Sequence, residues 1–237
     1  MSQQQFALPD GGVIPYTLKI SPRRRTIGLR IDRNGLSVHV PKRVSASTVN
    51  SILLEKSAWI RRKLAEWRDN APPPPSFEDG ATLQYLGQDI RLCLRQDPRI
   101  RTPEFDGARL HLSLPRPDDS QSVQRKLVQW YAKQARADFV RRVALLAARL
   151  GVPTPPVFLS SARTRWGSCN ARGEIRLHWR LVQAPPHLIH YVVAHELAHL
   201  KEMNHSARFW EWVETLCPEY KTARQELKAL SAQLHRL

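Results

Sequence analysis

The chain has 237 residues, of which 42% are hydrophobic and 24% are charged. These values are typical of a folded globular protein and exclude a wholly disordered or fibrous chain. The 37 Lys and Arg residues outnumber the 21 Asp and Glu residues, so the formal net charge is +16. Such a charge makes a polyanion a candidate partner, whether a nucleic acid, a phosphorylated substrate or an anionic membrane surface.

The first residues and the cysteines bear on the cellular compartment. The start, MSQQQFALPDGG, does not combine a basic stretch with an apolar run, and no run of about 18 apolar residues occurs in the chain. The cysteines Cys93, Cys169 and Cys217 are widely spaced and odd in number, which is atypical of a disulfide framework. We therefore expect a cytoplasmic protein without a membrane span.

Residues 1–75 are predicted to form a basic β-hairpin region followed by a helix. The segments TLKIS, TIGLRI and LSVHV read as three short antiparallel strands, and Asn34-Gly35 suits the turn between the last two. Apolar residues at helical spacing then predict one helix of about six turns. The prolines from Pro72 to Pro75 cannot continue this helix, so we place the first boundary there.

Residues 76–120 are predicted to be a second β-rich segment, with TLQYL, DIRLCL and ARLHLSL as strands. The rest of the chain, residues 121–237, is predicted to be the catalytic domain. It begins with a long helix that stops at Gly151, because glycine favours the left-handed conformation that ends helices. After it we expect strands over 157–159 and 174–182, and helices over 186–203, 206–216 and 220–237. No internal repeat is evident in the sequence.

Positive charge is concentrated in the first region, where residues 1–75 contain 13 basic and 5 acidic residues. Arg23, Arg24 and Arg25 begin a dense basic strip, for which a solvated surface is the plainest interpretation. Contact with a nucleic acid is the functional alternative, because cationic side chains on a small sheet can neutralise phosphates. The sequence has no helix-turn-helix, zinc-finger or RNA-recognition signature, so such binding would follow the backbone and be sensitive to salt.

The segment YVVAHELAHLKEMNHS carries the pattern most informative about chemistry. His195 and His199 are four residues apart on a predicted helix, so their imidazoles project from one face and can bind the same metal ion. Glu196 is offset around the helix, where it can reach a water molecule at the ion without binding the ion. Two histidines without a metal are the alternative, which the helical context and the nearby His205 disfavour.

Catalytic zinc sites generally have three protein ligands and one open position. His205 is the predicted third ligand, because Asn204 tolerates a left-handed conformation that could end the helix and Ser206 can cap the next one. The expected cofactor is one Zn²⁺ per chain, with cobalt, manganese and nickel as alternatives. The fallback protein ligands are Glu202, Glu211 and Glu214.

These residues predict a metal-dependent hydrolase that cleaves peptide bonds, with Glu196 as the general base that takes a proton from water. Its expected partner is a peptide or protein substrate. If the strand over 174–182 borders the metal, its free edge could pair with an extended peptide. Candidate contacts to the developing oxyanion or the substrate are His178 and Arg180 on this strand, with Arg163 and Arg165 before it.

Two other functions stay open on the residues alone. A metal-dependent hydrolase of phosphoanhydrides, such as a nucleotide pyrophosphatase, would use the surplus arginines to hold phosphates, although no glycine-rich phosphate loop supports it. A nucleic-acid-associated protein with a structural metal site is the third possibility. Glu196 argues against it, because a structural site gains nothing from a carboxylate beside the ion.

Several segments, in order along the chain, resemble the YgjP-like metallopeptidase family, which is related to the SprT-type zinc proteases. They are TRWGSC at 164–169, GEIRLHWRL at 173–181, YVVAHELAHL at 191–200, NHSARFW at 204–210 and the later CPEYK. The resemblance implies an α+β fold in which a zincin-like helical metallopeptidase domain follows a small antiparallel β-rich region. It also implies that His195, His199 and His205 bind zinc and that Glu196 is the catalytic base.

The sequence departs from related patterns at three positions. His178 stands where such proteins often carry asparagine. A metzincin arrangement needs a glycine where this chain has Glu202, and a methionine downstream of Met203, which is the last methionine. A gluzincin arrangement, with a glutamate ligand from the next helix, stays a minor alternative. We interpret Trp166 to Cys169 as a packed turn anchored by its tryptophan.

Overall fold

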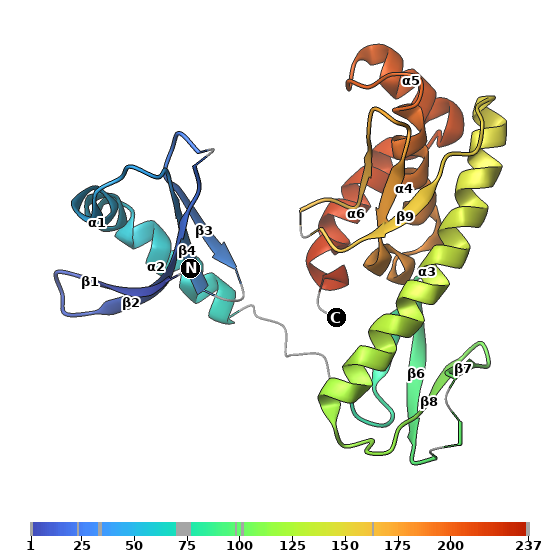
Figure 1. The fold of residues 1–237 in the computed structure, drawn as a ribbon, viewed down its shortest axis with the longest axis horizontal. Helices are drawn as coiled ribbons and strands as arrows, with labels where there is room; N and C mark the ends of the chain where they lie inside the picture. The colour runs from blue at the N-terminus through green and yellow to red at the C-terminus, as the bar shows by residue number, and fades with distance from the viewer. Residues whose placement is uncertain are drawn as a thin grey trace. The chain divides into compact units, whose positions relative to one another are not determined.

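The computed structural model confirms an α+β fold with two compact units, residues 1–73 and 74–237 (Figure 1). Each unit has its own hydrophobic core. Within the described part of the chain, no helix is both long and apolar enough to span a membrane. The structure describes residues 2–22, 24–32, 35–69, 77–97, 99–100, 102–162 and 164–235.

The first unit begins with a four-stranded sheet in the order β1-β2-β4-β3. The predicted hairpin of β3 and β4 is present and antiparallel, and Gly35 has the positive φ of 89° that its turn requires. β2 pairs in parallel with β4, because the chain passes from β2 to the far edge of the sheet before it returns. The strands are β1 (Ser2–Ala7), β2 (Val13–Ile20), β3 (Gly28–Asp32) and β4 (Gly35–Val40).

Two helices, α1 (Ala46–Glu55) and α2 (Ser57–Asp69), follow this sheet. The predicted single helix is therefore wrong, because the chain leaves the helical conformation at Lys56. Val49, Leu53 and Ile60 keep helical spacing across the break and are all buried, so periodicity alone does not reveal it. Ser45 caps α1 by accepting a hydrogen bond from the Thr48 amide at 3.1 Å.

The second unit begins with a sheet of the same topology as the first. Its order is β5-β6-β8-β7, with β6 and β8 parallel and the outer pairs antiparallel. Each sheet is followed by a proline, a capping residue and a helix, so the chain contains a structural repeat that the sequence analysis missed. The strands are β5 (Thr82–Tyr85), β6 (Gln88–Arg95), β7 (Glu104–Phe105) and β8 (Arg109–Ser113).

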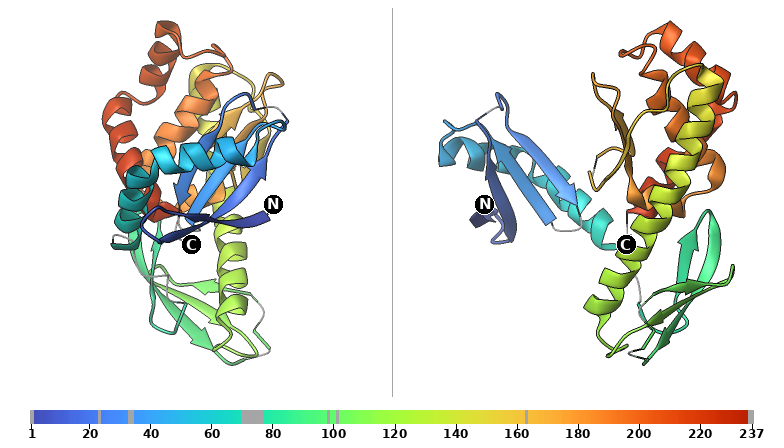
Figure 2. Two further views of the ribbon diagram at one scale, coloured as in Figure 1. Left: turned by 90° about the vertical axis from the view of Figure 1, so that its left-hand side faces the viewer. Right: turned by 45° about the vertical axis from the view of Figure 1, so that its right-hand side comes forward.

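The long helix α3 (Ser120–Leu150) joins this sheet to the rest of the second unit (Figure 2). Its N-terminal part packs on β5, β6 and β8, and its later turns pack on α4 (Pro186–Ala198). Asp119 caps its start. As predicted, the helix stops at Gly151, which has a φ of 67°. Residues 76–120 thus share one core with the metal-motif region.

The remaining elements surround α4. A three-stranded sheet has the order β10-β11-β9, with β11 antiparallel to β10 and parallel to β9. The predicted strand over 174–182 ends at His178, and a 3-10 helix, η1 (Trp179–Gln183), takes its place. The elements are β9 (Val157–Ser160), β10 (Gly167–Cys169), β11 (Ile175–His178), α5 (Ala207–Leu216) and α6 (Tyr220–Leu234).

The β5–β6 turn docks on the segment that leads into α4. The amides of Leu86 and Gly87 donate hydrogen bonds to the carbonyls of Val182 and Gln183, at 2.9 and 3.1 Å. Gly87 has a φ of 76°, and a Cβ atom there would lie 2.7 Å from the Cα of Pro185. A glycine is therefore needed for this close approach, which ties the sheet to the start of α4.

Candidate active site

Three histidine side chains converge at the C-terminal end of α4. One ring nitrogen from each of His195, His199 and His205 lies within 4.8 Å of the others. The Nε2 atoms of His195 and His205 are 3.1 Å apart. Two nitrogens that bind one tetrahedral zinc ion at about 2.0–2.1 Å lie roughly 3.3 Å apart, so the observed spacing fits a shared ion. Among the described residues, the fallback ligands Glu202, Glu211 and Glu214 do not join this group.

The end of α4 explains how His205 reaches the other two rings. The helix ends at Ala198, earlier than predicted, and the chain turns back over residues 199–205. Asn204 does not adopt the expected left-handed conformation; its Oδ1 accepts a hydrogen bond from the Ser206 amide at 2.9 Å, which closes a tight turn instead. Ser206 caps α5, as predicted.

The surroundings hold these imidazoles in the form that binds metal. Nδ1 of His199 lies 3.2 Å from the carbonyl oxygen of Glu202, which leaves its Nε2 for an ion. The Phe209 ring packs 4.6–4.9 Å from all three rings. Burial, followed by the charges of His199, His205 and Arg224, lowers the pKa of His195 to about 3. Burial also lowers the pKa of His199, so both rings are neutral near pH 7.

Glu196 lies on another side of α4, against β10. Its side chain is 4% exposed, and burial raises its pKa to about 8, with the charge of Arg165 acting in the opposite direction. A Cβ atom at Gly167 would come within 2.6 Å of the Glu196 Cγ atom. The carboxylate is thus packed directly on the backbone of β10. Residues 166–169, interpreted from sequence as a packed turn, therefore contain the strand that holds Glu196.

The other predicted contacts lie elsewhere. His178 is 1% exposed, and its Nδ1 accepts a hydrogen bond from the Arg180 amide at 3.1 Å. Its ring contacts Trp166, Trp179 and His235. The Arg180 guanidinium lies over the Trp179 ring at 4.2 Å. Among the described residues, neither side chain has a hydrogen bond or ring contact with the three histidines.

Two further expectations about this region are revised or stay open. β11 is the central strand of its sheet, so it has no free edge for a peptide, and β10 is the edge strand beside Glu196. The charge of Arg165 acts on Glu196, which keeps this side chain a candidate for contact with substrate. Arg163, the remaining arginine candidate, lies outside the described residues.

Sequence reasoning missed three residues beside the histidines. The rings of Tyr191 and Trp210 lie 6.1 and 5.8 Å from the His195 ring. The guanidinium of Arg224, from α6, lies 5.1 Å from the Trp210 ring, and its charge adds to the burial that lowers the pKa of His195. Burial raises the pKa of Tyr191, and the charge of Arg224 acts in the opposite direction. Tyr191 could have been found, because it is one helical turn before His195. Arg224 is 29 positions from His195 in sequence and has no local signal.

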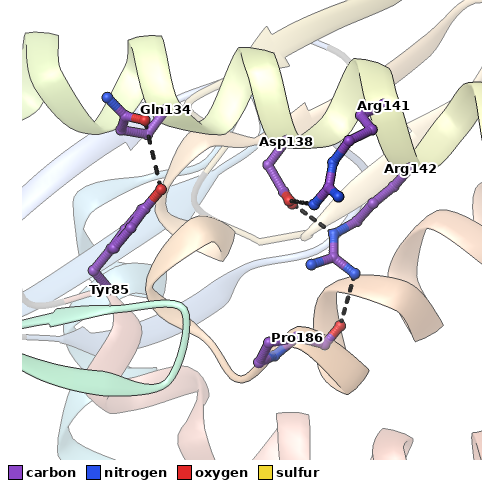
Figure 3. Close-up of polar contacts among 6 residues, drawn as sticks. All are labelled: Tyr85, Gln134, Asp138, Arg141, Arg142 and Pro186. Atoms are coloured by element: carbon purple, nitrogen blue, oxygen red, sulfur yellow. Dashed lines mark hydrogen bonds and ion pairs between the residues drawn. The ribbon is translucent and has the colours of Figure 1, made fainter. Parts of the chain in front are cut away.

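A buried ion pair fixes the start of α4 against α3 (Figure 3). Asp138 accepts hydrogen bonds from Arg142 Nε at 2.6 Å and from Arg141 Nη2 at 3.0 Å. Arg142 then donates from Nη1 to the carbonyl oxygen of Pro186, the first residue of α4, at 3.3 Å. One turn earlier on α3, Gln134 accepts a hydrogen bond from the Tyr85 hydroxyl at 3.5 Å. The Asp138–Arg142–Pro186 contacts connect α3 to the helix that carries the histidines, and the Tyr85–Gln134 bond connects α3 to β5.

Two solved structures show similarity, both metallopeptidase zymogens: abylysin of Pyrococcus abyssi, with 25% identity and a TM-score of 0.36, and jannalysin of Methanocaldococcus jannaschii, with 20% identity and a TM-score of 0.35. They cover 41% and 40% of this chain and 96% of their own chains. Among curated proteins, none matches the chain.

The family described as YgjP-like, metallopeptidase domain, matches residues 25–230. This match spans most of both units and includes the three histidines and Glu196. The chain therefore belongs to the YgjP-like metallopeptidase family and is a metal-dependent hydrolase.

Proposed function

We propose that the protein is a zinc-dependent peptidase in which His195, His199 and His205 hold one zinc ion and Glu196 is the general base. The observation that carries this proposal is the convergence of three imidazoles at the end of the helix that also carries the buried Glu196. Imidazole nitrogens suit zinc, and three protein ligands leave a position open for water or substrate. The donor set therefore fits a catalytic zinc ion better than a closed structural site.

When bound, zinc supplies Lewis acidity that lowers the pKa of water to about 7 and polarises a carbonyl group. The chain's own part is to move the proton. Glu196 accepts it from the attacking water on a carboxylate oxygen and then donates it to the leaving amine. Burial favours the protonated form that the carboxylate passes through, and the backbone of Gly167 fixes where the carboxylate lies. Two cations lie near these groups: the charge of Arg165 acts on Glu196, and the charge of Arg224 acts on His195.

The proposal includes a peptide or protein as the substrate. β10 is an edge strand and lies directly beside Glu196, so an extended peptide could add to it by main-chain hydrogen bonds. This arrangement favours a peptide over a nucleoside phosphate, for which the site offers no glycine-rich loop. The cysteines Cys93, Cys169 and Cys217 are free thiols, which supports a reducing compartment such as the cytoplasm.

The test compares Glu196→Gln with Glu202→Gln, which removes a nearby carboxylate that lies outside the histidine group. Glu196→Gln should retain about one zinc per chain and lose peptide hydrolysis at least about 100-fold, the usual contribution of a general base. Glu202→Gln should retain both the zinc ion and normal peptide hydrolysis. His205→Ala should lose zinc as well as activity, as measured by elemental analysis. Full activity of Glu196→Gln would contradict the mechanism, and hydrolysis of nucleoside triphosphates alone would contradict the substrate class.

A further inference from the structure

The sheet of the first unit has two unlike faces. One face packs on α1 and α2 through alternate apolar residues such as Ile14, Tyr16 and Val38. The strand registers place the intervening residues on the opposite face, which is polar and basic. We call this second face the open face; its residues include Gln3, Gln5, Thr17, Lys19, Gly28, Arg30, Ser37 and His39.

Cationic side chains from three segments gather on the open face around His39. Lys19 of β2 is the register partner of His39 on one side, and Gly28 of β3 is its partner on the other. The guanidinium of Arg24 lies over Gly28, 2.5 Å from where a Cβ atom would be, so the glycine makes room for it. Burial and then the charges of Arg24, Lys19 and Arg30 lower the pKa of His39.

Of the acidic residues in this unit, Asp32 ends β3 opposite Gly35. The acidic residues whose side-chain contacts are described lie in a turn or on the helices. Asp10, in the β1–β2 turn, pairs with Arg61 of α2. Glu55 pairs with Lys56, and Glu66 of α2 pairs with Arg62 and Lys63. Ion pairs thus balance charges on the helical side of the unit. Lys19, Arg24 and Arg30 lie together around His39 on the open face.

The repeated sheet of the second unit shows that the fold does not require this charge. Residues 76–120 contain 6 basic and 8 acidic residues, against 13 and 5 in residues 1–75. In the second sheet, Ser113 occupies the position of His39, and His111, which occupies that of Ser37, lies 3.3 Å from Asp106. The corresponding face of the second sheet also carries cations, Arg91, Arg95 and Arg109, but acidic residues accompany them. Glu104 is the register partner of His111, and Asp106 contacts the same ring.

We propose that the open face binds the phosphate backbone of a double-stranded nucleic acid. Lys19, Arg24 and Arg30 can neutralise phosphates, and the amides of Gln3 and Gln5 and the hydroxyl of Thr17 can donate hydrogen bonds to their oxygens. Aromatic residues of the described strands, Phe6 and Tyr16, belong to the other face, so this face offers bases no stacking platform. Binding is therefore independent of base sequence and favours a duplex. Of the run Arg23 to Arg25, Arg24 is part of this face and Arg23 lies outside the described residues.

The test uses the full-length protein and a mixed-sequence 20-base-pair DNA, with binding followed by fluorescence anisotropy at 50 and 200 mM salt. The face variant combines Lys19→Gln, Arg24→Gln and Arg30→Gln. The matched control combines Lys56→Gln, Arg62→Gln and Lys63→Gln, which removes the same charge from the helical side of the same unit. The face variant should bind at least tenfold more weakly, and the slope of log K against log salt should fall by about 3. The DNA affinity of the control variant should stay within about threefold of that of the unmodified protein.

Two further measurements separate this proposal from simpler explanations. A variant with Arg24→Lys and Arg30→Lys keeps the charges and should keep most of the affinity, which a folding defect would not permit. Bound phosphates should raise the pKa of His39, measured by NMR, because they oppose the charges of Lys19, Arg24 and Arg30. The face variant should hydrolyse peptides normally, so failure here and failure of the proposed peptidase function are distinguishable.

Three outcomes would overturn the proposal. These are no DNA binding by the unmodified protein at 50 mM salt, equal weakening in the face variant and the control, or no change in the pKa of His39. Phosphatidylserine vesicles serve as the competing polyanion. If they bind more tightly than DNA and depend on the same three residues, the face belongs to a membrane surface instead.

Discussion

Glu196 lies against the backbone of β10 at Gly167, and the contact leaves no space for a side chain at position 167. A methyl group there would overlap the Glu196 Cγ atom, because the two carbons would be 2.6 Å apart. Both partners are constrained, since Glu196 belongs to a buried helix and Gly167 to a paired strand. The glycine of the segment TRWGSC therefore acts as a positioning residue for the carboxylate.

Replacing Gly167 with alanine should move the Glu196 carboxylate without affecting the histidines. Because a displacement of about 1 Å at a catalytic group can reduce rates about 100-fold, we expect kcat to fall by that order while zinc content stays at about one per chain. Ser168→Ala, on the same strand, is the control and should retain most activity. Loss of zinc in Gly167→Ala would contradict a role limited to the carboxylate.

His178 shows why a strand pattern can mislead at a single residue. The alternation of GEIRLHWRL predicts that His178 shares an exposed face with Arg176 and Arg180. The strand ends at His178 itself, and its ring turns inward to cap η1 and contact Trp166. At this last strand residue the chain already turns into η1, so period-2 alternation does not determine on which side the His178 ring lies.

The burial of His178 should make the stability of the second unit depend on pH. Burial first, and then the charges of His235 and Arg180, lower the pKa of His178 from 6.5 to about 4. Between these values the unfolded chain binds more protons than the folded one, so stability falls as pH decreases through this window. The contribution of the neutral His178 ring to the free energy of unfolding is fully present above pH 6.5. Near pH 4, about 3 kcal/mol of it is lost.

His178→Asn isolates this contribution, because asparagine can still accept the hydrogen bond that caps η1 but does not titrate. Urea unfolding at pH 7 and pH 4.5 should show a smaller difference in the free energy of unfolding for the variant than for the unmodified protein. Since the other histidines titrate in both proteins, their effects cancel in the comparison. Equal pH dependence of the two would refute the assignment.

At the scale of elements, the long helix α3 and its end at Gly151 were predictable, whereas the early end of α4, the break between α1 and α2 and the strand partners were not. α3 begins and ends at Asp119 and Gly151 because a capping side chain and a left-handed glycine act locally. The break at Lys56 keeps the helical period, so the pattern contains no sign of it. The parallel pairing of β2 with β4 depends on a crossover, which the strands' own residues do not encode.

The residues of the candidate site also fall into those that the sequence could predict and those that it could not. His195, Glu196 and His199 are within one helix, so their spacing alone predicts which of them share a face. Gly167 and Arg224 reach the site from β10 and α6, and only the tertiary fold brings them there. Short-range geometry was therefore available from the sequence, and long-range contacts were not.

The contact between α3 and α4 predicts unequal roles for two neighbouring arginines. Arg142 has a side chain 15% exposed and connects Asp138 to the carbonyl of Pro186, whereas Arg141 binds the same carboxylate but is 67% exposed. Arg142→Ala leaves the buried carboxylate with only an exposed partner, so we expect a loss of about 3 kcal/mol in the free energy of unfolding. Arg141→Ala should lose less than about 1 kcal/mol. Chemical denaturation checks both, and similar losses would contradict this difference.

At the scale of the whole molecule, the chain uses one sheet topology twice with different surroundings. The first copy closes its core with α1 and α2 and presents the open face. The second copy shares its core with α3 and, through the Leu86-Gly87 turn, supports the segment that leads into α4. Metal chemistry therefore depends on the second unit, and the proposed nucleic-acid binding depends on the first.

Because the two cores share no buried residue, a cavity in one should leave the other intact. Leu53 is fully buried in the first core and Leu127 in the second. Leu53→Ala should destabilise the first unit by about 3 kcal/mol, as expected for a buried leucine, and leave peptide hydrolysis at its normal rate. Leu127→Ala should instead destabilise the unit that carries the histidines. Calorimetry should resolve two unfolding transitions, and each variant should lower the midpoint temperature of one of them. A single transition whose midpoint both variants lower would show that the units unfold together.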